Sequence, residues 1–151
     1  MTSSNPTVMH DAIQCLASRS LSEKELRVKL NHKGWLDQDI TMVIEKLRLR
    51  GYLNDEALCR HLFTKYVSSN KHGLKYILAK LKTRGLNTSL IQEDIANYNY
   101  QEEYNRALSM VERKFAKQPE IAQHKIARFL ITKGFTDSTV AKVISEITGQ
   151  Y

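Results

Sequence analysis

The pentapeptide Leu30-Asn-His-Lys-Gly34 returns twice in this chain, as Leu81-Lys-Thr-Arg-Gly85 and as Leu130-Ile-Thr-Lys-Gly134. Each copy has a leucine four residues before its glycine and a basic residue directly before it. Apolar residues also recur eight residues before, six residues after and ten residues after each glycine. These positions hold Leu26, Ile77 and Ile126, then Ile40, Ile91 and Val140, and then Ile44, Ile95 and Ile144. The glycines lie about fifty residues apart, a period typical of repeat proteins, and such a repeat favours a binding surface over a single catalytic cleft.

The spacing around each glycine predicts helices that begin and end at fixed points of the repeat. Apolar residues fall three and four positions apart, which is the period of one helix face. Each glycine is expected to end a helix, because glycine readily adopts the left-handed conformation found just past a helix C-terminus. Three residues later stands a residue of the helix-capping type that is expected to begin the next helix: Asp37, Thr88 and Asp137. Ser22 and Glu25 form a capping box, and Asn54-Asp55 forms another cap.

These signals predict an all-α protein of three tandem three-helix repeats. The expected repeats are residues 1–53, 54–99 and 100–151. A unit of about fifty residues buries little surface for its size, so neighbouring units should pack on one another. We therefore predict that the repeats form an elongated, curved array.

Composition narrows the class of protein. The chain has 151 residues, of which 42% are hydrophobic and 26% are charged, too apolar for a disordered chain. It has no apolar run of about eighteen residues that could span a membrane, and residues 1–11 lack the apolar centre of a signal peptide. We expect a cytoplasmic protein in which the two cysteines, Cys15 and Cys59, are unpaired thiols.

The charge points to an anionic partner. The net charge is +7, from 23 Lys and Arg against 16 Asp and Glu, which favours nucleic acid, an acidic protein groove or an anionic membrane surface. A protein that is merely basic and soluble is the alternative. No acidic residue lies between Tyr66 and Glu93, and this stretch holds the clearest run of basic residues, beside His72 and Tyr76.

Ten basic residues are the candidate contacts. The stretch just described contributes Lys71, Lys75, Lys80, Lys82 and Arg84; the third repeat contributes Lys125, Arg128 and Lys133; and the end of the third expected helix contributes Arg48 and Arg50. Such a surface is typical of phosphate binding. A solvated lysine face is the alternative, and Arg48 and Arg50 could instead complement the negative end of their helix.

No pattern in the sequence points to catalysis. A phosphate-cradling glycine loop is missing, and none of the five histidines has a partner at zinc-site spacing. The acidic pair Glu102-Glu103 is explained by the favourable placement of acids at a helix start. We therefore expect no enzyme activity, no cofactor and no metal ion.

The motifs resemble those of a known family, the RecX regulatory proteins. The run Ser20-Leu-Ser22-Glu-Lys-Glu25-Leu26-Arg-Val-Lys-Leu30-Asn-His-Lys33-Gly34 resembles the family's opening signature, as does Leu47-Arg-Leu-Arg-Gly51-Tyr52-Leu53-Asn54-Asp55-Glu56. Residues 71–86 and 129–135 match later motifs, so the resemblance extends from about residue 8 to residue 147. The chain departs from the family at Asn54, where an aspartate is usual, and at Leu58, where an aromatic residue is usual.

The resemblance implies both fold and function. It implies three tandem three-helix repeats in a bacterial cytoplasmic protein that binds the RecA recombinase filament on DNA. Such a protein lies in the filament groove and restrains homologous recombination, strand exchange, ATP hydrolysis and the co-protease activity of the SOS response to DNA damage. The implied partners are the RecA filament and, weakly and without sequence preference, single- and double-stranded DNA, bound by a monomer that has no membrane contact.

Two other functions fit the residues. The short helical units could act as helix-turn-helix modules of a stand-alone DNA-binding protein, which would bind bare DNA with a steep salt dependence. A helical adaptor for an unrelated acidic protein is the third interpretation.

Overall fold

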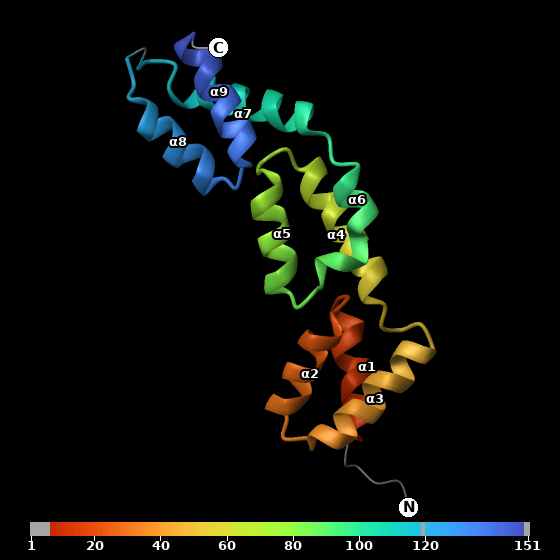
Figure 1. The fold of residues 1–151 in the computed structure, drawn as a ribbon. Coiled ribbons are helices and arrows are strands. Elements are labelled where there is room, and N and C mark those ends of the chain that lie inside the picture. The colour runs from red at the N-terminus through yellow and green to blue at the C-terminus, as the bar shows by residue number, and fades with distance from the viewer. Residues whose placement is uncertain (1–6, 119, 150–151) are drawn as a thin grey trace, which may run out of the picture. The chain divides into compact units, whose positions relative to one another are not determined.

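The computed structural model describes residues 7–118 and 120–149, and all regular structure in these residues is helical (Figure 1). The helices are α1 (Val8–Ser18), α2 (Glu23–His32), α3 (Asp37–Leu49), α4 (Asp55–Ser68), α5 (Leu74–Thr83), the 3₁₀ helix η1 (Thr88–Ile91), α6 (Gln92–Ala96), α7 (Tyr100–Lys114), α8 (Gln123–Thr132) and α9 (Asp137–Thr148). The predicted all-α class is confirmed. The three repeat boundaries and the curved array stay predictions, and the outermost residues of that division, 1–6 and 150–151, lie outside the described residues.

The helices pack into two compact units. The first contains α1, α2, α3, the part of α4 up to His61, and residues 81–91. The second contains residues 62–80 and the described residues from Gln92 onward, which include α6, α7, α8 and α9. Helices α4 and α5 therefore contribute residues to both units.

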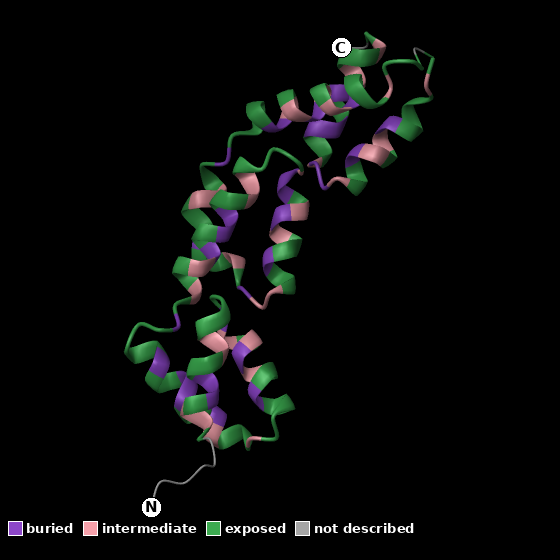
Figure 2. Ribbon diagram, turned by 180° about the vertical axis from the view of Figure 1, so that it is seen from behind, coloured by how far each residue is buried: buried purple, intermediate pink, exposed green. Residues whose placement is uncertain are grey.

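The cores follow the repeat pattern of the sequence (Figure 2). In the first unit α1, α2 and α3 enclose one apolar cluster, and in the second α7, α8 and α9 enclose another. Seven of the nine repeated apolar positions are buried, namely Leu26, Ile77, Ile126, Ile40, Ile91, Val140 and Ile44. The other two, Ile95 and Ile144, are partly buried. Burial of these side chains supplies most of the favourable free energy that holds such short helices in place.

The helix ends confirm the glycine signals and correct three of the caps. Gly34, Gly85 and Gly134 have φ values of 91°, 78° and 80°, the left-handed conformation predicted for them. Asp37 and Asp137 are the first residues of their helices rather than the caps, which are Leu36 and Thr136. The turn after each of these two glycines is one residue shorter than predicted, so the extended cap residue comes two positions after the glycine.

The two other predicted caps are confirmed. The side-chain oxygen of Ser22 accepts from the backbone of Glu25, whose carboxylate accepts from the backbone of Ser22, so the capping box is complete. The amide oxygen of Asn54 accepts from the backbone of Ala57 at 3.0 Å, which caps α4. By contrast Thr88, like Asp37 and Asp137, is the first residue of its helix rather than the cap; it begins η1, the 3₁₀ helix that leads into α6. The side-chain oxygen of the preceding Asn87 accepts from the backbone of Ser89 at 3.0 Å.

Two further properties of the described residues bear on function. No described helix has the length and apolar character needed to cross a membrane. Cys15 is half-buried and Cys59 is buried, and no disulfide joins these two described residues.

Candidate functional site

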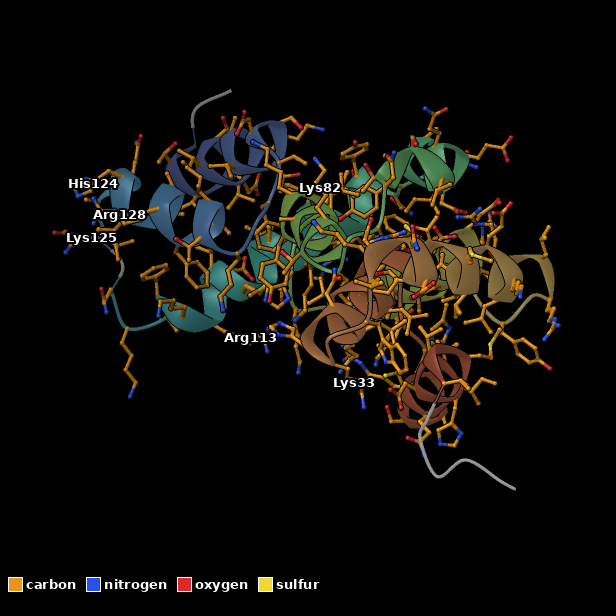
Figure 3. The ribbon with its side chains drawn as sticks, turned by 90° about the horizontal axis from the view of Figure 1, so that it is seen from below. Lys33, Lys82, Arg113, His124, Lys125 and Arg128 are labelled. Atoms are coloured by element: carbon orange, nitrogen blue, oxygen red, sulfur yellow. The ribbon has the colours of Figure 1, made fainter. Side chains whose placement is uncertain are left out.

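The predicted basic residues divide into those with partners and those without. On α8, Lys125 and Arg128 are exposed and project with His124 from one end of the helix (Figure 3). Lys82 near the end of α5 and Arg50 after α3 are also exposed. Within residues 7–118 and 120–149, no ion pair involves any of these four candidates, Lys82, Arg50, Lys125 and Arg128.

Three of the predicted residues are engaged by carboxylates. Arg48 forms a two-pronged ion pair with Glu23, with N–O distances of 2.6 and 2.9 Å. The hydrogen bond from Arg48, joined by its charge, lowers the pKa of Glu23 despite partial burial. Lys75 pairs with Asp137 at 2.9 Å on the surface. Arg84 is mostly buried and pairs with Glu25, as described next.

Arg84 belongs to a contact that the structure makes twice. Each time, the start of the middle helix of one repeat meets the loop that follows the middle helix of the next repeat. We call the contact of residues 22–25 with Arg84 and Gly85 the first junction, and the contact of residues 73–76 with Lys133 and Gly134 the second junction. The first junction lies inside the first compact unit and the second lies inside the second unit.

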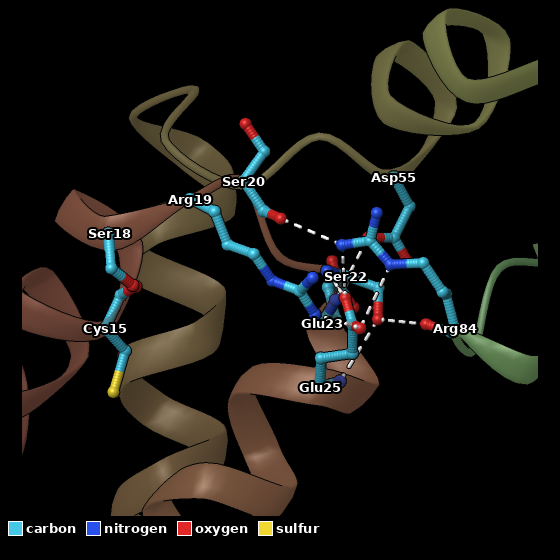
Figure 4. Close-up of polar contacts among 9 residues, drawn as sticks. All are labelled: Cys15, Ser18, Arg19, Ser20, Ser22, Glu23, Glu25, Asp55 and Arg84. Carbon is cyan, nitrogen blue, oxygen red and sulfur yellow. Dashed lines mark hydrogen bonds and ion pairs between the residues drawn. The ribbon is translucent and has the colours of Figure 1, made fainter. Parts of the chain in front are cut away.

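The first junction is held by polar side chains (Figure 4). The Ser22 hydroxyl donates to the Arg84 carbonyl at 2.5 Å. The Arg84 guanidinium donates to both carboxylate oxygens of Glu25, at 2.9 and 3.1 Å, and to the Ser20 carbonyl at 3.0 Å. Burial raises the pKa of Glu25, but the hydrogen bonds from Arg84 and Ser22 outweigh it, so that pKa lies below its ordinary value. Glu25 and Arg84 therefore satisfy each other.

The second junction is held by the backbone. The N–H groups of Gly73 and Lys75 donate to the carbonyls of Lys133 and Gly134, at 3.0 and 2.9 Å. A Cβ atom on Gly134 would collide with the backbone of Tyr76, and a Cβ on Gly73 would collide with the backbone of Phe135. Glycine is thus required at both positions by this close approach.

A carboxylate completes the start of the middle helix at each junction. Asp55 accepts from the backbone of Glu23, the first residue of α2, at 3.0 Å. Glu103 accepts from the backbone of Leu74, the first residue of α5, at 2.8 Å. Glu103 is fully buried and also accepts from the hydroxyls of Tyr98, Thr136 and Thr139. Glu103 therefore joins α5, α7 and α9, a role that its position in the first turn of α7 does not indicate.

The second junction also gathers cations around two aromatic rings. The rings of His72 and Tyr76 are stacked, with centroids 3.6 Å apart and planes inclined by 8°. The Lys80 ammonium lies 5.7 Å from the centre of the Tyr76 ring and 5.6 Å from that of Tyr66. Burial lowers the pKa of His72, and the charges of Lys133, Lys80 and Lys71 lower it further.

We name this set of residues the cation–aromatic cluster; its members are Lys71, His72, Tyr76, Lys80 and Lys133. In the described part of the chain no carboxylate pairs with any of the five. The backbone beneath them is fixed, because Arg106 donates to the His72 carbonyl at 3.2 Å and Glu103 anchors Leu74. Lysine ammonium groups bind phosphate and aromatic rings stack on bases, so the cluster has the chemistry of a nucleic-acid contact.

The fold brings together only some of the residues that the sequence singled out. Lys71, Lys80 and Lys133 meet at the cluster although Lys133 is distant in sequence. Lys125 and Arg128 lie on α8 outside the cluster, and Arg48, Arg50, Lys82 and Arg84 belong to the first unit. The register of the repeat indicates which residues meet at the cluster. The residue nine positions before one repeat glycine lies at the same junction as the residue directly before the next repeat glycine.

Comparisons with known proteins agree with the repeat fold. Residues 9–47 match the family model for the first three-helix domain of RecX. The Regulatory protein RecX of Pelodictyon phaeoclathratiforme is 32% identical over 140 residues, which cover 89% of this chain and 86% of the relative. That of Geobacillus thermodenitrificans is 30% identical over 142 residues, or 91% of this chain and 53% of the relative. This chain thus spans about half the length of its Geobacillus relatives.

Solved structures show the same fold. The crystal structure of RecX from Lactobacillus salivarius has a TM-score of 0.80 with this chain at 20% sequence identity. The aligned residues cover 93% of this chain and 94% of that one.

Proposed function

The chain belongs to the RecX family of regulatory proteins, and on that premise we propose that it binds the RecA filament on DNA and restrains the filament's activities. The activities restrained would be recombination, strand exchange, ATP hydrolysis and the co-protease activity of the SOS response. Its repeats would contact more than one RecA protomer and hinder the relative motion that turnover and growth require.

The observation that carries the proposal is the cation–aromatic cluster. Three lysines surround a stacked histidine and tyrosine, and no described carboxylate neutralises them. A filament on DNA offers phosphate groups and acidic protein surface together, which suits a chain with a net charge of +7. Lys82, Lys125, Arg128 and Arg50 are further exposed candidates for the same contact.

The test is a titration of RecA ATPase activity on single-stranded DNA, beside a binding assay on the same DNA without RecA. We expect inhibition at protein concentrations well below those needed to coat the bare DNA. Tight binding to bare DNA without any effect on RecA would instead favour the stand-alone DNA-binding protein, and steep salt dependence would accompany it.

Charge reversal locates the contact. Lys71→Glu combined with Lys80→Glu should weaken inhibition by about tenfold, because both changes place negative charge beside the filament's phosphates. The control is Lys142→Glu, on the exposed surface of α9, which changes charge in the same direction outside the cluster. Inhibition that survives in the double variant would exclude the cluster as the contact.

A further inference from the structure

The first junction forms a cleft at the place that corresponds to the cation–aromatic cluster. The cleft lies between the exposed face of α2 and the end of α5 and has a volume of about 430 Å³. Its lining includes Lys24, Glu25, Val28, Lys29, His32 and Arg84. All of these residues belong to the first compact unit.

The cleft is cationic because its single lining carboxylate is already paired. Glu25 is bound by Arg84, and Arg19 lies 3.2 Å from it as a second partner. Lys24 and Lys29 are exposed, and no ion pair in the described residues engages either of them. Two lysine charges therefore remain free to pair with an anionic ligand.

The position of Lys24 is fixed by the junction. A Cβ atom on Gly85 would lie 2.7 Å from the Cβ of Lys24, so the lysine stem packs directly on the glycine. Packing of an aliphatic stem leaves the ammonium group at the solvent end of the side chain. The charge at this end of the cleft is thus held by a structural contact.

The middle of the cleft is apolar. Val28 lies between Lys24 and Lys29 on α2 and is 46% exposed, although its neighbours Leu26 and Leu30 are fully buried. An exposed valine between two lysines offers an apolar contact together with two charges. The imidazole of His32 is the one aromatic ring in this lining, so the cleft lacks a stacked pair of rings like that of His72 and Tyr76 at the second junction.

We propose that this cleft binds an acidic segment of a partner protein, with one apolar side chain of the segment on Val28 and carboxylates on Lys24 and Lys29. The inference rests on the proposed function only for the identity of the partner, which would be the protein part of the filament. Charge complementarity selects an acidic ligand. The exposed Val28 favours a peptide over a phosphate backbone, because a peptide also carries apolar side chains. The two junctions would then divide the contact, with protein at the first and DNA at the second.

The test uses the full chain and a fluorescent acidic peptide, with alternating Asp and Glu around a single Leu. We expect saturable binding that shifts the methyl NMR signals of Val28. Lys24→Glu combined with Lys29→Glu should weaken peptide binding by about tenfold or more, and Val28→Asp should do the same. Val28→Ile, which keeps the apolar contact, should bind like the unaltered chain. A peptide with Ser in place of Leu should bind more weakly.

The controls separate this inference from the proposed function. Lys117→Glu combined with Lys142→Glu makes the same change in net charge at exposed positions outside the cleft and should bind the peptide normally. Failure of the peptide to bind, or its displacement by oligo-dT, would overturn the inference. In the RecA ATPase assay, a Lys24/Lys29 variant that no longer inhibits RecA but still binds bare DNA supports the inference. A variant that loses inhibition and bare-DNA binding in parallel overturns it. If the unaltered chain binds the peptide but does not inhibit RecA, the proposed function alone fails.

Discussion

The two junctions join the same positions of the repeat but hold them with different groups, side chains at the first and backbone hydrogen bonds at the second. Glu25 at the first junction corresponds in the repeat to Tyr76 at the second, since each lies nine residues before its glycine. Arg84 likewise corresponds to Lys133, directly before the next glycine. At the first junction the two residues form a mostly buried ion pair. At the second they are a tyrosine stacked on His72 and a lysine that pairs with no carboxylate of the described residues. The repeat thus specifies the contact, and single substitutions decide whether its charge is satisfied internally or offered to a ligand.

The carboxylates that accept from the start of the middle helix, Asp55 and Glu103, also differ between the junctions in how fully they are hydrogen-bonded. Asp55 makes one hydrogen bond to the start of α2, and burial leaves its pKa above the ordinary value. Burial also raises the pKa of Glu103, but the hydrogen bonds from Thr139, Leu74, Thr136 and Tyr98 reverse the direction, so its pKa is lowered. The second junction, where no carboxylate of the described residues pairs with Lys71, Lys80 or Lys133, rests on the better satisfied carboxylate.

Removal of these carboxylates should give the largest difference between the junctions. Glu103→Ala strands several buried donors, each of which costs roughly 1–3 kcal/mol, and we expect a total loss of about 4 kcal/mol in the free energy of unfolding. Asp55→Ala removes one helix-capping bond, and we expect a loss of about 1 kcal/mol. Urea unfolding followed by circular dichroism measures both. Glu102→Ala, an exposed neighbour of Glu103, is the control and should cost about 0.5 kcal/mol; equal losses for Glu103 and Asp55 would contradict the comparison.

Substitution of each of the three repeat glycines by alanine should destabilise the protein in proportion to how closely other atoms approach that glycine. All three have left-handed φ values, so each alanine pays about 1 kcal/mol or more for conformation. Gly34→Ala meets no other atom within 4 Å and should cost only that amount. Gly85→Ala meets the Lys24 side chain and should cost about 2 kcal/mol, whereas Gly134→Ala meets the Tyr76 backbone and should cost about 3 kcal/mol. Thermal unfolding of the three variants gives the ranking, and any other order would show that the junctions are not packed as described.

The regular features of the fold could be predicted from the sequence because they depend on local chemistry. Gly34, Gly85 and Gly134 end helices through their own backbone conformation, and Ser22 with Glu25 caps α2 through contacts three residues apart. The capping preference places Asp37, Thr88 and Asp137 one position too late as caps, because the length of a turn depends on packing that this preference does not report. Terminal residues of helices are the least certain part of such a prediction.

The candidate site was only partly predictable, because its residues meet through contacts distant in sequence. The basic run from Lys71 to Arg84 was visible as a charge pattern. The pattern did not distinguish Arg84, which is saturated by Glu25, from Lys80, which lies over aromatic rings. Glu103 resembled an ordinary first-turn acid, since nothing local indicates that Thr136 and Thr139 would reach it. Partners of this kind are fixed only when the helices pack.

The smallest expected effect is on the pH dependence of stability, because only the second junction has a titratable histidine at this position of the repeat. His72 at the second junction corresponds in the repeat to Leu21 at the first, which is buried and cannot titrate. Burial and the charges of Lys133, Lys80 and Lys71 lower the pKa of His72 below 6.5, so the folded state resists a proton that the unfolded state accepts. The contribution of His72 is therefore unchanged above pH 6.5, and stability is lost as pH falls from there through the pKa of the folded state. His72→Gln should remove this part of the acid sensitivity in urea unfolding at a series of pH values.

Phosphate bound at the cation–aromatic cluster should reverse that shift. Its negative charge offsets the lysines and favours the imidazolium, so the pKa of His72 should rise when a single-stranded oligonucleotide binds. By linkage, affinity for the oligonucleotide should then increase as pH falls through the range in which His72 titrates. NMR titration of the His72 ring with and without the oligonucleotide measures the change, and the ring signals of His61 in the first unit serve as the control. If the oligonucleotide binds and leaves the His72 titration unmoved, its phosphates lie elsewhere, and the second junction is a structural contact of the same kind as the first.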